Sequence, residues 1–147
     1  MELSVFALRL AAAMVGGGLI GLERELSNKS AGLKTNMLVS IGACIYVLIN
    51  LSLVESQGAG DPTRIIGQIV TGIGFLGGGV ILHRGLNVHG LTTAATIWCS
   101  AAVGCLAGLG MFKEAGVATL AVLTVNFALK KLDGWFDDEI QKRKKGE

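Results

Sequence analysis

Four polar side chains lie in or beside long apolar stretches of this sequence: Arg9, Asp61, Arg64 and Gln68. Arg9 is about two turns, roughly 10 Å, inside the apolar run Leu3–Leu22 if that run is helical. A cation at such a depth in a membrane requires a charged partner or a wet cavity. We therefore expect the four side chains to form an intramembrane polar cluster, which either binds a solute or fixes the packing of the helices that carry it.

Asp61 and Arg64 also have the pattern of a helix start. The segment reads Asp-Pro-Thr-Arg, and Asp is favoured at a helix N-cap, with Pro at the first helical position. Capping does not exclude a salt bridge from Asp61 to Arg9 or Arg64. Gln68 lies one turn after Arg64, so their polar ends share a face below the cap. Asp61 is our one candidate metal ligand, and a metal site is not expected.

Five apolar runs can hold these residues in membrane-spanning helices, each of which needs roughly 20 mostly apolar residues. They are Leu3–Leu22, Met37–Val54, Arg64–Leu82, Leu91–Leu109 and Phe112–Leu132. The 147 residues are 51% hydrophobic and include 22 Gly concentrated in these runs, as in tightly packed membrane helices. We predict an all-α polytopic membrane protein, with a bundle of five transmembrane helices over residues 1–132 and a cytoplasmic, amphipathic and basic tail over residues 133–147.

The basic residues fall mainly on one side of the membrane in this five-span topology. That side holds residues 23–36, residues 83–90 and the tail with its cluster Lys142–Lys145, whereas the other side carries only Arg64 and Lys113. The positive-inside bias therefore places the N-terminus outside and the C-terminus in the cytoplasm. The tight connection between the fourth and fifth runs leaves a four-span alternative open, with the tail outside.

A stripe of small residues follows one side of the third run and consists of Gly67, Thr71, Gly74 and Gly78. Such a face lets a neighbouring helix approach closely, so we predict a helix-packing or oligomer interface there, with a homodimer favoured. The same spacing recurs in the first and fourth runs, at Gly17 with Gly21 and at Gly104 with Gly108. The spacing does not decide which of these faces meet within one chain and which meet between chains.

The cytoplasmic hairpin between the first and second runs carries opposite charges close to the membrane surface. Its polar residues are Glu23, Arg24 and Glu25 before the turn and Lys34, Thr35 and Asn36 after it. Charge pairs there would contribute under about 1 kcal/mol, so contact with a partner protein is an alternative role. Thr92 and Thr93 open the fourth run, where we expect their hydroxyls to cap the helix; the alternative is a bond across to another helix.

No motif in the sequence carries catalysis. It has no phosphate-binding loop, no HExxH and no nucleophile elbow, and His83 and His89 have no carboxylate nearby in sequence to complete a metal site. We therefore expect a protein that is not an enzyme, with no catalytic residue and no cofactor. Magnesium enters only as a physiological signal or ligand, and nucleic acid is not an expected partner.

Five segments together resemble the MgtC/SapB family of bacterial inner-membrane proteins. They read GLERE, AGLKTN, DPTRI, QIVTGIGFLG and GLTTAATIW, and occupy residues 21–25, 31–36, 61–65, 68–77 and 90–98. The resemblance implies a multi-pass protein of the bacterial cell inner membrane, linked to survival at low magnesium and, in pathogens, to growth inside macrophages. The best-known member is held to restrain the rotary ATP synthase, and its direct transport of magnesium is doubted.

The sequence departs from the family pattern in two places. Family members often have His where this chain has Asn36. Many members also carry a soluble carboxy-terminal domain resembling the ACT fold; this sequence stops soon after the fifth run, and we expect a short form without it. Virulence does not transfer, because even close relatives differ in it.

Three functions are open at this point. The first is a regulator that contacts another membrane complex such as the ATP synthase, the second a magnesium or other ion transporter or channel, and the third a membrane scaffold that only assembles. No Asp or Glu lies in the middle of any run, and the positive charge of Arg9 would repel magnesium from a pore. This favours the regulator, although backbone carbonyls around Gly77–Gly79 could line a path.

Overall fold

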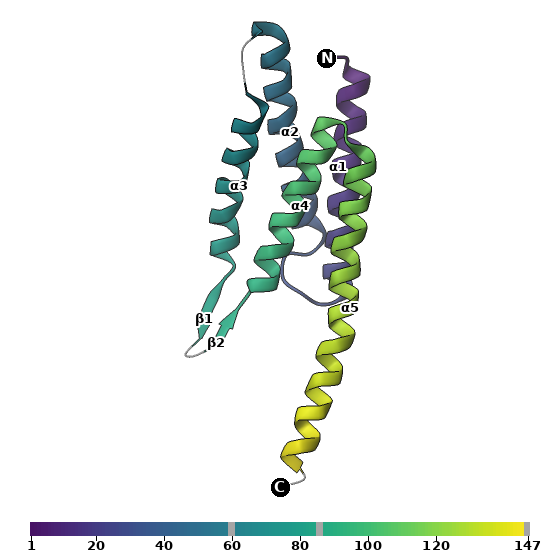
Figure 1. Ribbon diagram of the computed structural model, residues 1–147, viewed down its shortest axis with the longest axis vertical. Coiled ribbons are helices and arrows are strands. Elements are labelled where there is room, and N and C mark those ends of the chain that lie inside the picture. Colours follow the sequence, from purple (N-terminus) through teal and green to yellow (C-terminus); the bar gives the residue numbers. More distant parts are fainter. Residues whose placement is uncertain (59–60, 85–86, 146–147) are drawn as a thin grey trace.

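The structure, a computed structural model, describes residues 1–58, 61–84 and 87–145, and side chains as far as Ala128 except those at positions 57, 62, 83, 84 and 87. Five helices and one β-hairpin follow one another along the chain (Figure 1). They are α1 (Leu3–Leu26), α2 (Leu33–Gln57), α3 (Pro62–Gly79), β1 (Leu82–Arg84), β2 (Asn87–His89), α4 (Leu91–Leu109) and α5 (Phe112–Lys145).

Successive helices run in alternating directions, so the two termini lie at opposite ends of the molecule (Figure 1). One end, the amino-terminal end, holds Met1, the α2–α3 connection and the α4–α5 turn. The other, the hairpin end, holds the α1–α2 loop and the β-hairpin. The α4–α5 turn is as tight as predicted, with Gly110 in the left-handed conformation at φ 80°. This alternation is the one that the five-span topology requires.

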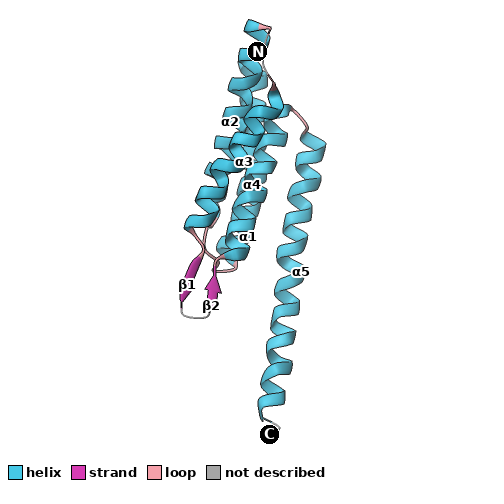
Figure 2. Ribbon diagram, turned by 60° about the vertical axis from the view of Figure 1, so that its left-hand side comes forward, coloured by secondary structure: helices cyan, strands magenta, loops and turns pink. Residues whose placement is uncertain are grey.

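Three helices are long and apolar enough to cross a membrane: α1, α2 as far as Ser56, and α4. They support the prediction of a helical membrane protein. Among the described residues, α3 and α5 are not in this group of helices long and apolar enough to cross a membrane. A membrane span through each of them therefore stays a prediction, as does the orientation of the chain in the membrane. Figure 2 shows α5 extending well beyond the hairpin end, so the predicted tail continues this helix as far as Lys145.

Local sequence determines where α3 begins and ends. Asp61 Oδ1 accepts hydrogen bonds from the backbone N–H of Thr63 at 2.9 Å and from its hydroxyl at 2.7 Å, so the predicted N-cap is confirmed. These two hydrogen bonds, the hydroxyl one foremost, lower the pKa of the exposed Asp61 carboxyl from its usual value. The helix ends before the predicted limit, because Leu82 enters β1 and pairs with His89 in an antiparallel ladder where the sequence predicts a loop.

The centre of the molecule is the packing of α1, α2 and α4, with α5 against α1 and α4, and α3 against α4 and α2. Glycines let the three central backbones approach closely. A Cβ added at Gly104 would lie 2.1 Å from the carbonyl oxygen of Ser40, and one added at Gly17 would lie 2.6 Å from that of Asn36. The predicted small-residue faces of the first and fourth runs are therefore used within the chain.

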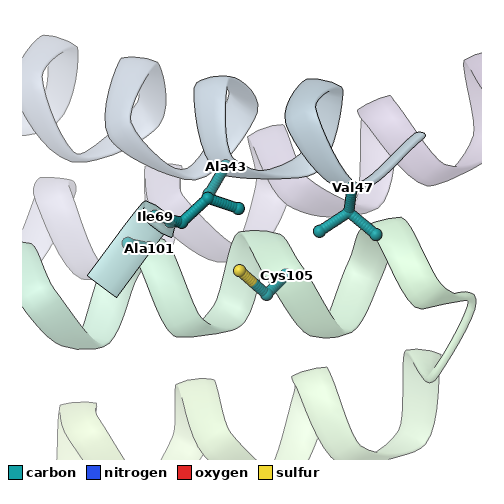
Figure 3. Close-up of a cluster of buried hydrophobic side chains, with 5 residues drawn as sticks. All are labelled: Ala43, Val47, Ile69, Ala101 and Cys105. Carbon is teal, nitrogen blue, oxygen red and sulfur yellow. The ribbon is translucent and has the colours of Figure 1, made fainter. Parts of the chain in front are cut away.

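Side chains fill the remaining space with small and branched residues. One buried cluster joins α2, α3 and α4 and consists of Ala43, Val47, Ile69, Ala101 and Cys105 (Figure 3). A second joins α1 to α2 and α4 and consists of Ala13, Cys44, Leu48 and Ala107. Because Ile69 is the single α3 residue in the first cluster, α3 is attached to the bundle along a narrow strip.

Candidate functional site

Arg9 does not join the other three residues of the predicted intramembrane cluster, which all belong to α3 and its N-cap. Arg9 Nη1 donates to the backbone oxygen of Gly108 at 2.8 Å, whereas Asp61 binds Thr63, and Arg64 and Gln68 are exposed on α3. The expected salt bridge between Arg9 and Asp61 is not present among the described residues. The reason is lateral placement: α1 packs against α2, α4 and α5, while α3 lies on the far side of α2 and α4.

Arg9 instead stabilises the end of α4. The last carbonyls of a helix lack intrahelical partners and carry partial negative charge, which a guanidinium can satisfy. Besides its bond to Gly108, the Arg9 guanidinium packs on Gly110, whose added Cβ would lie 3.2 Å from Nη2. The intramembrane cation thus finds its partner in a helix terminus, which explains how it is tolerated without a carboxylate.

A second polar group, at the hairpin end, joins α1 to the α1–α2 loop and to α4. Arg24 is only 4% exposed, and its Nη2 donates to Thr93 Oγ1 at 2.7 Å and to the Ser30 carbonyl oxygen at 3.1 Å. The capping prediction for the threonines is therefore wrong: the N-cap of α4 is Gly90, without a side-chain cap bond, and Thr93 bonds across to α1. Thr92 is exposed.

Glu23 joins α1 to α5 at the same end. Its carboxylate, in a residue 5% exposed, accepts from Asn126 Nδ2 at 2.8 Å and from Ser27 Oγ at 2.9 Å. Glu25 accepts from the backbone N–H of Leu33 at 3.0 Å, at the start of α2. The expected ion pairs across the α1–α2 turn are absent among the described residues, because neutral donors already occupy these carboxylates.

Asn36 holds the α1–α2 loop against α4. The side chain is fully buried, donates to the carbonyl oxygens of Ala31 and Gly32, and accepts from Ser100 Oγ at 2.8 Å. Ala31 has a positive φ of 55°, an uncommon conformation for a residue with a side chain, and its bond from Asn36 helps to hold it there. The loop is thereby fixed to the bundle rather than loosely connected to it.

These bonds build what we call the hairpin-end platform: the α1–α2 loop (residues 27–32), the first turn of α2 and the first turn of α4. Its interior is closed by Arg24, Asn36 and Thr93. Its outer surface consists of exposed side chains, among them Lys29, Lys34, Thr35 and Thr92. No group of three or more metal-ligating side chains occurs among the described residues. The platform offers a rigid contact surface rather than a reaction centre.

The predicted small-residue stripe of α3 faces away from the bundle. All four members are exposed, and no atom lies within 4 Å of a Cβ added at any of its three glycines. The Thr71 hydroxyl donates to the Gly67 carbonyl oxygen of its own helix at 3.0 Å. The stripe thus has no packing role inside the chain, and its use between chains stays a prediction.

Sequence reasoning missed several partners in these networks. Asn36, Ser40 and Cys44 lie four residues apart on α2, and their side chains contact Ser100, the Ala13 carbonyl oxygen and the Arg9 carbonyl oxygen respectively. A polar residue at every fourth position of an apolar run is a detectable signal for a buried hydrogen-bonded face. Asn126 carried no comparable signal, because its partner Glu23 lies on a helix distant in sequence.

Comparison with known proteins identifies a family and several relatives of this chain. The MgtC family profile matches residues 10–135. The chain is 53% identical over 123 residues to Protein MgtC of Brucella abortus, and 49% identical over 126 residues to Protein MgtC of Salmonella typhimurium, alignments that cover 84% and 86% of this chain. It is also 49% identical over 139 residues, 95% of its length, to the uncharacterized protein slr0014 of Synechocystis sp..

The alignments cover 50%, 53% and 58% of those three relatives, so the chain spans about half the length of the curated relatives that it matches. No solved structure matches the chain. The match to the family profile nevertheless covers α2, α3 and α4 in full, α1 from residue 10 and α5 as far as residue 135, and it includes the hairpin-end platform. This chain belongs to the MgtC family.

Proposed function

We propose that the chain is a non-enzymatic, multi-pass protein of the bacterial inner membrane that regulates a membrane partner, such as the ATP synthase, and so supports adaptation to low magnesium. The family resemblance supplies the physiological setting and the candidate partner. The hairpin-end platform is the observation that carries the proposal, because it combines a fixed interior with an exposed polar surface.

The platform has the properties of a preorganised docking surface. Hydrogen bonds that Arg24 and Asn36 donate and that Glu25 accepts fix both sides of the α1–α2 loop, so little conformational entropy remains to be lost on binding. Its lysines, Lys29 and Lys34, are exposed and free to meet acidic groups of a partner or the anionic inner leaflet. In the predicted orientation this surface lies in the cytoplasm, at the level of the membrane interface.

Transport is the competing function, and the arrangement of polar groups argues against it. Three polar side chains in the α1/α2/α4 centre, Asn36, Ser40 and Ser100, bond to one another or to backbone oxygens over short distances. A pathway for a hard dication needs oxygen ligands that exchange with water. The charge that the sequence places furthest inside a predicted span is the guanidinium of Arg9, which disfavours a cation.

The proposal is tested in inverted membrane vesicles from cells that contain or lack this protein. ATP-driven proton pumping, read by quenching of an acridine dye, should be slower when the parent chain is present. The double variant Lys29→Glu/Lys34→Glu should restore pumping, because it reverses the charge of the platform. Lys113→Glu is the matched control: it reverses an exposed lysine at the amino-terminal end and should leave the inhibition in place.

A second assay separates regulation from transport. Purified parent protein in liposomes should give no more magnesium entry, read by an internal dye, than empty vesicles. Entry that depends on the protein and is lost in Asp61→Asn would identify a transporter. Unchanged proton pumping with well-folded parent protein would remove the ATP synthase as the partner.

A further inference from the structure

An exposed row of side chains runs the length of α3. It consists of Asp61, Arg64, Gln68, Thr71, Phe75 and Gly78, all of them exposed in the single chain. Their steps alternate between three and four residues, which is the heptad spacing that joins two helices crossing at about 20°. We call this row the α3 seam. We propose that two copies of the chain pair in the membrane through their α3 seams, in a symmetric dimer.

The seam is separate from the face by which α3 joins its own bundle. Ile69, 8% exposed, marks the bundle side together with the half-buried Ile65 and Ile73. Phe75 is 84% exposed, the highest value among the large apolar side chains described. Pairing through the seam therefore leaves every intrachain contact of α3 in place.

Lipid is a poor cover for this row. Gln68 lies about 10 Å along α3 from the Asp61 cap, at a rise of roughly 1.5 Å per residue, and its amide has no hydrogen-bond partner within hydrocarbon. Arg64 lies between them and is likewise exposed. Polar side chains inside a membrane generally face protein or water. The row is thus better matched to another protein surface than to acyl chains.

The charges of the seam select a second copy of the same chain. A two-fold axis along the membrane normal sets the two α3 helices parallel, with identical levels facing each other. Asp61 and Arg64 are adjacent seam positions of opposite charge, about 4.5 Å apart along the axis, so the long Arg64 side chain of each copy reaches across to the Asp61 carboxylate of the other at the neighbouring level. Two reciprocal ion pairs result. Gln68 then faces its own counterpart, and an amide, being both donor and acceptor, is complementary to itself.

The apolar half of the seam is self-complementary in shape. Beside it, α2 and α3 enclose a groove of about 490 Å³, lined mainly by apolar side chains such as Leu38, Tyr46 and Leu76. Phe75 of a second copy has the polarity and size to enter this groove. Gly78, one turn further on and without a side chain, lets the two backbones approach. Phe75 and the groove belong to the same surface of the chain, as a two-fold interface requires.

Cysteine cross-linking tests the contact without disturbing the fold. Thr71→Cys places a thiol in the middle of the seam, and mild oxidation in liposomes should give mostly disulfide-linked dimers. Val70→Cys is the matched control: it lies one residue away, is 43% exposed in the parent, and points about 100° around the helix, so it should give few. The parent, with its native cysteines, provides the baseline. Equal yields at both positions, or none at Thr71→Cys, would overturn the proposal.

Exchanging the charges at Asp61 and Arg64 tests whether the partner of the seam is a second copy of this chain. Arg64→Asp makes both members of the pair acidic and Asp61→Arg makes both basic, so each variant alone should dimerise at least about tenfold more weakly than the parent, a loss of about 1.4 kcal/mol. Mixed together, the two variants restore opposite charges at both pairs. Energy transfer between differently labelled variants should show a heterodimer within about threefold of the parent affinity.

Three outcomes would contradict this account: a parent that stays monomeric at high protein-to-lipid ratio, variants that each dimerise as well as the parent, or a mixture no tighter than either variant alone. Helical content by circular dichroism checks that both variants fold, since Asp61→Arg also removes the α3 cap. The cross-linking experiment with Thr71→Cys does not need this check, because that substitution leaves the Asp61 cap in place. The dimer does not depend on the proposed regulation, so either can fail while the other stands.

Discussion

The contact between Gly104 and Ser40 allows a sharp prediction about what holds the bundle together. A methyl group added at Gly104 would lie 2.1 Å from the Ser40 carbonyl oxygen, where ordinary contact begins at 3.4 Å, so α2 and α4 must separate locally by about 1.3 Å. The obstructing atoms are backbone, which cannot rotate away as a side chain would. Gly104→Ala should therefore destabilise the folded protein, although Ala normally favours a helix.

The magnitude follows from three contributions. Overpacking of this kind costs about 1–3 kcal/mol. Separation also weakens the nearby bond from Ser100 to Asn36, 2.8 Å long in the parent, whose loss costs about 1 kcal/mol. The higher helix propensity of Ala returns about 1 kcal/mol. We expect Gly104→Ala to lower the free energy of unfolding by about 1–3 kcal/mol.

The assay is titration of the protein with sodium dodecyl sulfate in mixed micelles, followed by circular dichroism. Gly74→Ala is the matched control, because no atom lies within 4 Å of a Cβ added at Gly74. That variant should keep the parent's free energy of unfolding or raise it by up to about 1 kcal/mol through helix propensity. A Gly104→Ala protein as stable as Gly74→Ala would refute the close packing of α2 and α4.

Three further predictions concern the polar contacts. Arg9→Met removes the bond to the Gly108 carbonyl and should lower the free energy of unfolding by about 1–3 kcal/mol in the same titration, whereas an unchanged value would mean that α4 does not need this partner. Asn126→Leu leaves the buried Glu23 carboxylate without its α5 donor, so amide hydrogen exchange in α5 should become faster; unchanged exchange would contradict that attachment. Because the folded pKa of Asp61 is lowered, the stabilisation from its cap is complete above the unfolded pKa of about 4 and is lost as pH falls through the folded value. The protection of amides near the start of α3, meaning the exchange rate relative to the intrinsic rate at each pH, should therefore fall below about pH 4 in the parent but not in Asp61→Asn, which still caps; identical pH profiles of protection would refute the assignment.

Much of the fold follows from local patterns. The α4 limits at Leu91 and Leu109 match the predicted run because an apolar segment and its flanking glycines coincide there. The Asp61 cap follows from its own three-residue context. The predicted run at the end of the chain stops at Leu132, whereas α5 continues to Lys145, because hydropathy marks where lipid ends and not where helical hydrogen bonding ends.

The site was harder to predict, since a topology gives the depth of a residue but not its lateral neighbours. Arg9 and Asp61 belong to the same end of the molecule, yet α2 and α4 separate their helices. Arg9 found a backbone carbonyl at Gly108, a group that every residue type possesses and that sequence cannot single out. Arg24 and Thr93 were both singled out, and only the packing of α1 on α4 joined them.

The central claim, that this chain regulates a membrane partner, is tested most directly with purified components. ATP synthase is reconstituted into liposomes alone or with increasing amounts of this protein, and ATP-driven proton pumping is measured at fixed synthase content. We predict that pumping falls as the parent protein is added and stays high with the platform variant Lys29→Glu/Lys34→Glu. Pumping that is indifferent to folded parent protein at every ratio would contradict the account.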